Sequence, residues 1–96
     1  MVEFSPEARN DNADIRGYTL NESGEKQVDT YLSKLAEGFQ RIRVMPGIGR
    51  RHAAIPDDLL RVKVDQHYLV YQHAAAQIYI VRILFTRSKL GRYFEE

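Results

Sequence analysis

The sequence predicts an α+β fold: a helical hairpin packed on a small antiparallel sheet, with the elements in the order strand, helix, helix, strand, strand, strand. Two observations carry this prediction. Residues 60–85 contain three runs of apolar, aromatic and β-branched residues separated by short polar stretches, which predicts three strands joined by short turns. Apolar residues at steps of three and four predict a long amphipathic helix from Glu25 to about Val44. A chain of 96 residues forms one domain, spanning residues 1–96, and is too short for two.

The N-terminal part of the chain contains a short predicted strand, residues 2–4, followed by a helix start. In Ser5-Pro6-Glu7, serine suits the N-cap, proline suits the first helical position, and glutamate favours the positive end of the helix dipole. The first helix is predicted to run from Pro6 to about Leu20, and residues 21–24 end it. The residues expected to point inward are Ala8, Ile15, Tyr18 and Leu20.

The second helix has the stronger pattern. Its apolar stripe consists of Val28, Leu32, Leu35, Phe39 and Ile42, with Tyr31 alongside. Gly38 within this helix costs about 1 kcal/mol relative to alanine, so we expect a close backbone contact or a local bend there. Residues 45–49, Met-Pro-Gly-Ile-Gly, end the helix, because proline and two glycines stop it sharply. The spacing of the two glycines matches neither common phosphate-loop pattern, so we interpret them as a structural turn.

The three C-terminal strands are predicted from alternation and composition. Residues 60–64 alternate apolar and polar, Asp65-Gln66 is a two-residue turn, residues 68–71 return, and residues 73–77 connect to the last strand. That strand, Ile78–Phe85, is apolar on both faces and is expected near the centre of the sheet. Arg82 interrupts it and needs a carboxylate, carbonyl or ligand partner, because an unpaired buried charge is very costly.

The helical hairpin is expected to pack on one face of these strands. The residues expected at that interface are Ile15, Val28, Leu32, Leu35, Phe39, Val62, Val70, Ile80 and Leu84.

Composition excludes several classes of protein. The chain has no cysteine, which excludes disulfides and thiolate metal sites and suits a reducing cytosol. No signal peptide is visible, and the longest apolar run is too short to span a membrane, so we predict a cytoplasmic protein without a membrane partner. The three histidines, His52, His67 and His73, show no metal-binding spacing and are assigned structural or surface roles. No cofactor and no metal are predicted.

Charge is distributed unevenly along the chain. Residues 1–38 contain four Lys/Arg and eight Asp/Glu, a balance of −4, whereas residues 39–96 contain ten and five, a balance of +5. Either the basic half meets something anionic, or the two halves complement each other within the fold.

An ordered set of motifs spans nearly the whole chain. They are Phe4-Ser5-Pro6-Glu7-Ala8, Asp14-Ile15 with Tyr18, Gly24, Pro46-Gly47-Ile48-Gly49-Arg50, Leu60-Arg61, His67-Tyr68-Leu69-Val70-Tyr71 and Ile80-Val81-Arg82-Ile83-Leu84. In this order they resemble the ParE branch of the RelE/ParE toxin superfamily, the toxins of bacterial toxin–antitoxin pairs. The resemblance implies a RelE/ParE-like fold and a small cytoplasmic toxin that a cognate antitoxin, ParD-like or similar, holds inactive in a hetero-oligomer. ParE-type members poison DNA gyrase, whereas RelE-type members cut mRNA on the ribosome.

The residues near the last strand favour the first of these two activities. RNA cleavage through the 2′-hydroxyl needs a base, an acid and cations for the charged transition state. Relatives often have a histidine after the Arg-Val-Leu motif, but here that position is Phe85, which cannot transfer a proton. We therefore predict a non-enzymatic inhibitor of DNA gyrase, with a ribosome-dependent endoribonuclease as the alternative. In that alternative the catalytic candidates are Arg61, Lys63, Arg82 and Tyr93.

Two contact surfaces are also predicted. The basic tail residues Arg87, Lys89 and Arg92 are expected to contact the target, because terminal charged residues are seldom buried. Aromatic residues in excess of what the core holds suggest an antitoxin-binding surface. Its candidates are Tyr31, Leu90, Tyr93 and Phe94, which could equally be ordinary surface or core-edge residues. Arg61 and Arg82 could also be structural and pair with carboxylates of the acidic helices.

Overall fold

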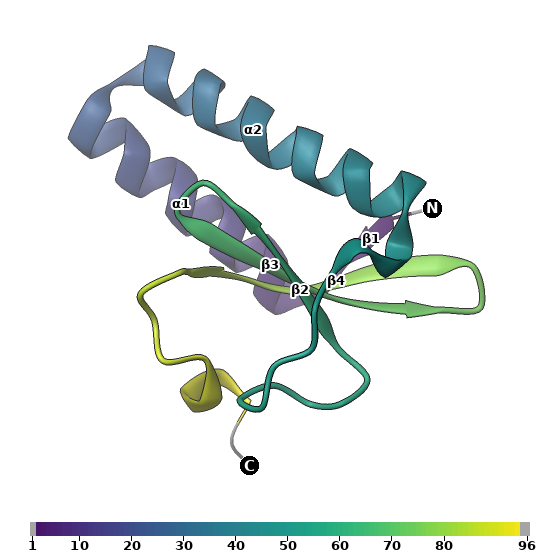
Figure 1. The fold of residues 1–96 in the computed structure, drawn as a ribbon. Helices are drawn as coiled ribbons and strands as arrows, with labels where there is room; N and C mark the ends of the chain where they lie inside the picture. The colour runs from purple at the N-terminus through teal and green to yellow at the C-terminus, as the bar shows by residue number, and fades with distance from the viewer. Residues whose placement is uncertain (1, 95–96) are drawn as a thin grey trace.

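The computed structural model describes residues 2–94 and confirms the α+β prediction. Its elements are β1 (Val2–Phe4), α1 (Pro6–Ser23), α2 (Glu25–Val44), the 3₁₀ turn η1 (Pro46–Ile48), β2 (Leu60–Val64), β3 (His67–Ala74), β4 (Gln77–Phe85) and the 3₁₀ turn η2 (Leu90–Tyr93). The α1–α2 hairpin covers one face of the sheet, and the loop before β2 and the C-terminal segment lie on its other side (Figure 1).

The sheet has four strands in the order β1-β4-β3-β2. Strands β2, β3 and β4 form the predicted antiparallel meander, and β4 is internal, as its apolar faces predicted. Strand β1 pairs parallel to β4, which makes the sheet mixed rather than purely antiparallel. This pairing gives the backbone groups of β4 around residues 78–80 hydrogen-bond partners on that edge.

Helix α1 begins where its sequence predicted. The backbone N–H of Ala8 donates to Ser5 Oγ over 2.9 Å, and the Ser5 hydroxyl in turn donates to the carbonyl of Val81 at 2.6 Å. The helix continues to Ser23, past the predicted end at Leu20, and stops at Gly24, whose φ is 84°.

The prediction that Tyr18 and Leu20 point inward is wrong, because they are 53% and 45% exposed. At about 100° per residue, Leu20 lies roughly 140° around the helix from the buried Ile15, and Tyr18 lies at the flank of the stripe.

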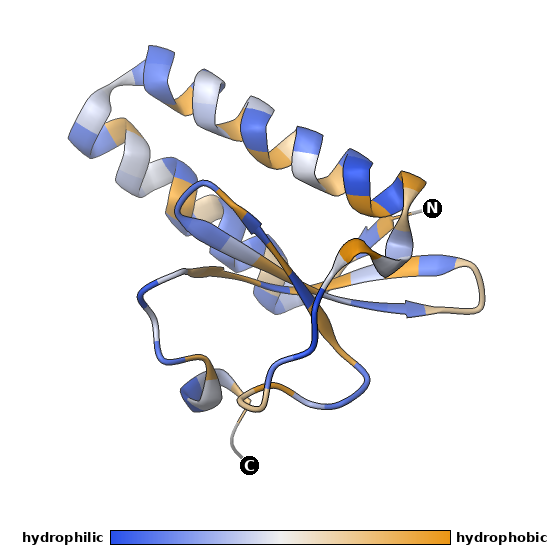
Figure 2. Cartoon of the chain, in the orientation of Figure 1, coloured by the Kyte–Doolittle hydropathy of each residue, from blue (hydrophilic) through white to orange (hydrophobic). Residues whose placement is uncertain are grey.

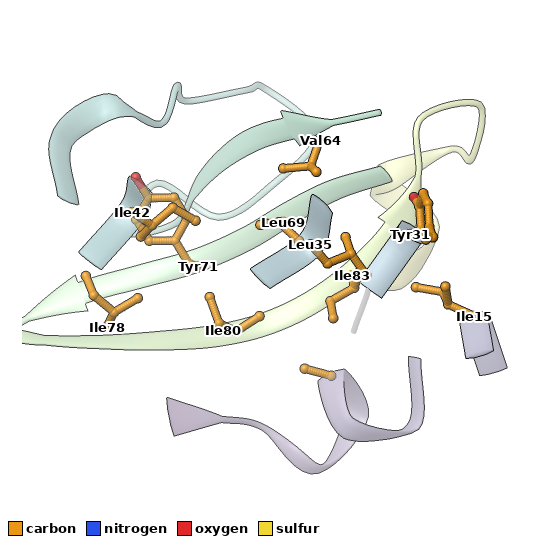
Figure 3. Close-up of a cluster of buried hydrophobic side chains, with 11 residues drawn as sticks. Ile15, Tyr31, Leu35, Ile42, Val64, Leu69, Tyr71, Ile78, Ile80 and Ile83 are labelled. Carbon is orange, nitrogen blue, oxygen red and sulfur yellow. The ribbon is translucent and has the colours of Figure 1, made fainter. Parts of the chain in front are cut away.

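Helix α2 has the predicted bounds, and hydrophobic and hydrophilic residues recur in turn along it (Figure 2). Its buried side chains meet those of α1 and of the strands in the main core (Figure 3). That cluster consists of Ala8, Ile15, Tyr31, Leu35, Ile42, Val64, Leu69, Tyr71, Ile78, Ile80 and Ile83. Val28 is also buried, and Leu32, Phe39 and Val62 are partly buried, as expected for the helix–sheet interface.

A second cluster fills the opposite face of the sheet. It consists of Ile55, Leu59, Val70, Leu84 and Leu90. The prediction that Val70 and Leu84 face the helices is therefore wrong. Val70 alternates with Leu69 and Tyr71, which take the helix side.

The position of Leu84 follows from a bulge in β4. Val70 pairs with Arg82 and Tyr71 pairs with Ile80, so Val81 has no opposite residue. The extra residue changes the phase of the alternation, and Ile83 instead of Leu84 follows Ile80 on the helix side.

The turns of the meander are tight. Asp65-Gln66 forms the predicted two-residue turn, with Asp65 at a φ of 54°. The predicted 73–77 connection is shorter than expected, because β3 runs to Ala74 and β4 begins at Gln77. Ala75 and Ala76 make this turn with φ values of 52° and 64°, a conformation that twists with the strands but disfavours alanine.

Gly38 makes the close contact that its position predicted, and replacing it tests the packing of α2. A Cβ at Gly38 would lie 2.5 Å from Val64 Cγ2 and 3.0 Å from Leu69 Cδ1. We expect Gly38→Ala to destabilise the protein by about 1–3 kcal/mol through overpacking, although alanine favours a helix. Gly17→Ala in α1, where a Cβ has open space, should instead stabilise by about 0.5–1 kcal/mol. Urea unfolding of both variants checks this, and equal shifts of the same sign would contradict it.

No helix within residues 2–94 is both long and apolar enough to cross a membrane.

Candidate functional site

The Arg82 guanidinium is held by a carboxylate from α1. Its Nε donates to Asp11 Oδ2 and its Nη2 donates to Asp11 Oδ1, both over 2.8 Å. The backbone N–H of Ile83 also donates to Asp11 Oδ2 at 2.9 Å. The hydrogen bond to Asp11 raises the pKa of Arg82 above its usual value. Asp11 is thus the partner that a charge in this apolar strand required, and it joins α1 to β4.

A cleft of about 370 Å³ opens beside this pair, between α1, the end of β4 and the C-terminal segment. The Arg82 guanidinium lies 4.8 Å from the centre of the Tyr93 ring, a cation–π contact that joins the C-terminal segment to the ion pair. Asp14, Tyr18, His67 and Phe85 also line the cleft. The cleft thus brings one paired cation together with aromatic rings and carboxylates.

His67 lies at the inner wall of the cleft and is buried. Its Nδ1 is hydrogen-bonded to the hydroxyl of Tyr31, and its Nε2 is buried without a partner among the described residues. Burial lowers the pKa of His67 to about 4, and the charge of Asp11 opposes this shift only in part. The imidazole is therefore neutral at neutral pH and joins β3 to α2, a structural role.

The buried His67 gives the fold an acid-sensitive point. Because its pKa is about 4 in the folded state and about 6.5 in the unfolded state, the unfolded chain binds more protons between these values. We therefore expect the free energy of unfolding to fall by about 3 kcal/mol as the pH is lowered from 6.5 to 4, because protons bind His67 in the unfolded chain. At pH values well above 6.5, His67 should not contribute to the pH dependence of stability. Urea unfolding across this range measures the loss. His67→Gln is the matched control, and an equally steep pH dependence in that variant would contradict the assignment.

Phe85 closes the end of β4. Its ring centre lies 4.3 Å from that of His67 and 6.0 Å from that of Tyr18, in an edge-on contact with the latter. The Arg87 guanidinium lies 5.4 Å from its ring centre. The end of β4 is therefore closed by a packed apolar ring, at the position where the resemblance led us to look for a histidine.

The four predicted nuclease residues fall into two separate groups. Arg82 and Tyr93 meet in the cleft, whereas Arg61 and Lys63 lie on the edge strand β2, with β3 between them and β4. Arg61 has no carboxylate partner in the described residues. Its guanidinium lies 4.2 Å from the centre of the Tyr68 ring.

The predicted contact residues of the tail differ in accessibility. Arg87, Lys89 and Arg92 are exposed, as expected for a target surface. Tyr93 is exposed and Phe94 is half-buried against the second cluster. Tyr31 and Leu90 are not available as an antitoxin surface in this conformation, because they are buried in the two cores. Tyr31 follows the core stripe of α2, and Leu90 fills the space beneath the loop before β2.

The sequence interpretation missed an exposed apolar pair at the end of α2. Val44 and Met45 are 71% and 62% exposed and line a hollow of about 870 Å³ between α2 and β2. Lys34 and Asp65 lie on its polar rim, paired at 3.5 Å. The signal was present in the sequence for Val44, which lies about 160° around the helix from the stripe residue Ile42. Met45 continues the spacing of the stripe, but α2 ends at Val44, so Met45 does not continue the buried helix face.

Solved structures with a similar fold include the following two. One is a chain of the chromosomal ParDE TA system from P. aeruginosa, with a TM-score of 0.75 and 12% identity, covering 88% of this chain and 92% of that one. The other belongs to the intact E. coli RelBE toxin–antitoxin complex, with a TM-score of 0.59 and 14% identity, covering 92% and 98%. No curated protein sequence matches the chain significantly. These likenesses identify the RelE/ParE fold.

The sequence defines the branch within that fold. Residues 2–90 match the family described as the ParE toxin of the type II toxin–antitoxin system, parDE. The chain therefore belongs to the ParE toxin family.

Proposed function

We propose that this protein is the toxin of a bacterial type II toxin–antitoxin module, acting in the cytoplasm as a non-enzymatic inhibitor of DNA gyrase that a cognate, ParD-like antitoxin neutralises. Membership of the ParE toxin family supports the target and the partner. The observation that carries the non-enzymatic mode is the end of β4, where Arg82 is paired with Asp11 and Phe85 occupies the terminal position.

The cleft is poorly equipped for RNA cleavage. A ribonuclease needs cations free to meet the charged transition state and groups that exchange protons with the substrate. The bidentate bond to Asp11 already occupies the Arg82 guanidinium, and His67 is enclosed by Tyr31 and Phe85. Inhibition by binding needs only a shaped and charged surface, which the chain offers.

The antitoxin is expected to cover exposed apolar surface with a segment that folds on binding. The large hollow beside α2 exposes the apolar side chains of Val44 and Met45, and the cleft beside Arg82 exposes the rings of Tyr18 and Tyr93. A hetero-oligomer with the antitoxin buries them and removes their contact with water. The two structures of similar fold, a ParDE system and a RelBE complex, support a partner of this kind.

The target surface is expected at the basic tail, and charge reversal tests it. In Arg87→Glu/Lys89→Glu/Arg92→Glu, we expect inhibition of gyrase supercoiling to be lost, because an exposed cationic contact becomes anionic. The thermal unfolding midpoint should stay nearly unchanged, since exposed side chains contribute little to stability. The matched control, Arg9→Glu/Arg16→Glu/Lys26→Glu, reverses three exposed charges on the helical hairpin and should still inhibit. Inhibition by the tail variant at the wild-type concentration would contradict this surface.

The contact between Arg82 and Tyr93 favours the alternative, a RelE-like ribosome-dependent endoribonuclease. In that function Tyr93 would exchange the proton and Arg82 would meet the transition-state charge. Purified toxin is therefore also assayed for mRNA cleavage on translating ribosomes. Cleavage there, with gyrase supercoiling unaffected, would overturn the proposed function in favour of this alternative.

A further inference from the structure

Four cations from three segments surround one hollow at the β2 edge of the sheet. Arg41 comes from α2, Arg50 from the segment after η1, and Arg61 and Lys63 from β2. The hollow measures about 380 Å³, and no carboxylate of residues 2–94 lines it. Within residues 2–94 none of these four side chains has an acidic partner within 4.0 Å. The hollow is therefore a concentration of positive charge that no ion pair within residues 2–94 neutralises. Glu37 and Asp65 lie at the larger neighbouring hollow, which Arg41 and Lys63 also line.

The fold holds two of these charges face to face. Arg50 and Arg61 form an antiparallel bridge in which each N–H donates to the other's carbonyl over 2.9 Å. Residues bridged in this way carry their side chains on the same face, and like charges directly opposite destabilise a sheet. Lys63, two residues further along β2, adds a third charge to that face. An anion between these side chains would offset the repulsion.

Protection of the sheet edge does not explain the whole arrangement. Lysine or arginine on an edge strand hinders pairing with other chains, and Arg61 and Lys63 meet that need. Arg41 and Arg50 lie outside β2, yet they turn the edge into a four-cation hollow. Apart from Ile48 and Val62, the lining is polar or aromatic. Four cations with no facing carboxylate among residues 2–94 differ from the core of a protein–protein interface, where charged residues are depleted.

We propose that this hollow binds the phosphate backbone of duplex DNA. The inference rests on the proposed function, because duplex DNA is what gyrase acts on, and it gives the toxin a second contact in addition to its protein target. Duplex DNA presents its phosphates outward and its bases inward. Single strands are usually held by open aromatic rings that stack on bases. The ring that residues 2–94 place at this hollow, Tyr68, is covered on one face by Arg61.

The salt dependence of binding tests the proposal. A fluorescent duplex of about 25 base pairs is titrated with the full chain, and its anisotropy is followed between about 50 and 200 mM salt. Four phosphate contacts give a slope of log K against log salt of about −3.6, which is a loss of roughly 150-fold over that range. A slope near zero, or no binding at about 50 mM salt, would overturn the proposal.

Two matched variants assign the binding to the hollow. Arg41→Gln/Arg50→Gln/Lys63→Gln should reduce the slope to about −1, because three contacts are lost. Arg87→Gln/Lys89→Gln/Arg92→Gln removes the same charge from the tail and should keep the wild-type slope. Arg41→Lys/Arg50→Lys keeps the charge and should keep the slope, which guards against loss through misfolding. Equal losses in both glutamine variants would overturn the site.

Two further measurements distinguish duplex DNA from other anionic ligands, and distinguish this proposal from the proposed gyrase target. If single-stranded RNA of equal length or polyglutamate binds more tightly than the duplex, the choice of duplex DNA as the ligand is overturned. Gyrase supercoiling is measured with the same proteins. A chain that inhibits gyrase without binding DNA overturns this proposal alone, whereas one that binds DNA without inhibiting gyrase overturns the proposed target alone.

Discussion

Replacing Asp11 with alanine is expected to destabilise the protein by about 3–5 kcal/mol, because the largely buried Arg82 guanidinium then has no counter-ion. The side chains of Arg82 and Asp11 are only 20% and 11% exposed. The variant also removes the acceptor of the Ile83 backbone N–H, at the point where α1 meets β4. Urea unfolding monitored by circular dichroism measures the loss.

Two controls isolate the ion pair. Asp14→Ala removes an exposed carboxylate from the same helix and should change the free energy of unfolding by no more than about 0.5 kcal/mol. Asp11→Ala combined with Arg82→Met removes both charges and should recover much of the loss, because no buried charge is then left unpaired. If Asp11→Ala cost as little as Asp14→Ala, the pair would not hold α1 on the sheet.

Local patterns predicted much of the fold. The stripe of α2, the glycine and proline stop after it, and the alternation of β2 depend on residues close together in the sequence, and the structure has them where predicted. Gly38 and Arg82 were informative because each breaks its local pattern at a cost. Each cost implied a tertiary contact, and the structure supplies Val64 and Asp11 respectively.

Errors arose where the answer depends on distant parts of the chain. The bulge at Val81 comes from the register between β3 and β4, and it moves Leu84 to the opposite face without any glycine to signal it. The parallel pairing of β1 with β4 also could not be predicted, because it depends on which edge of the β2–β3–β4 meander is open to another strand. The prediction for Tyr18 is wrong because the buried stripe of α1 is narrow: it contains Ala8 and Ile15, and Tyr18 lies at its edge.

The site was predicted less well than the fold, because a sequence shows the charge and chemistry of each side chain but not where the fold places it. Arg61, Lys63 and Arg82 are equivalent cations in a sequence, but the strand order places the first two on the edge and the third in an internal strand. Tyr31 was a candidate for antitoxin binding because it is aromatic, but in the structure its hydroxyl is hydrogen-bonded to His67 and its ring belongs to the core. The hollow that Arg41 and Arg50 share with β2 forms only when η1 returns to the sheet.

Truncating Leu35 to alanine should have the second large effect, a loss of about 2–5 kcal/mol. Leu35 is 1% exposed and lies at the middle of α2, and its side chain is beside Leu69 and Ile83 in the main core (Figure 3). The cost has two parts, the lost transfer of apolar surface out of water and the cavity left behind. A close-packed neighbourhood that includes the β-branched Val64 and Ile83 collapses poorly into such a cavity, so a value in the upper half of the range is expected.

Leu20→Ala is the matched control, because it makes the same chemical change at a side chain of α1 that is 45% exposed. It should change the free energy of unfolding by no more than about 0.5 kcal/mol, since alanine suits a helix and little packing is lost. Urea unfolding of both variants under the same conditions gives the difference directly. A loss below about 1 kcal/mol for Leu35→Ala would mean that α2 meets the sheet through another face. Since Tyr31, Leu35, Gly38 and Ile42 share one stripe, the contacts of Gly38 with Val64 and Leu69 would then be in question as well.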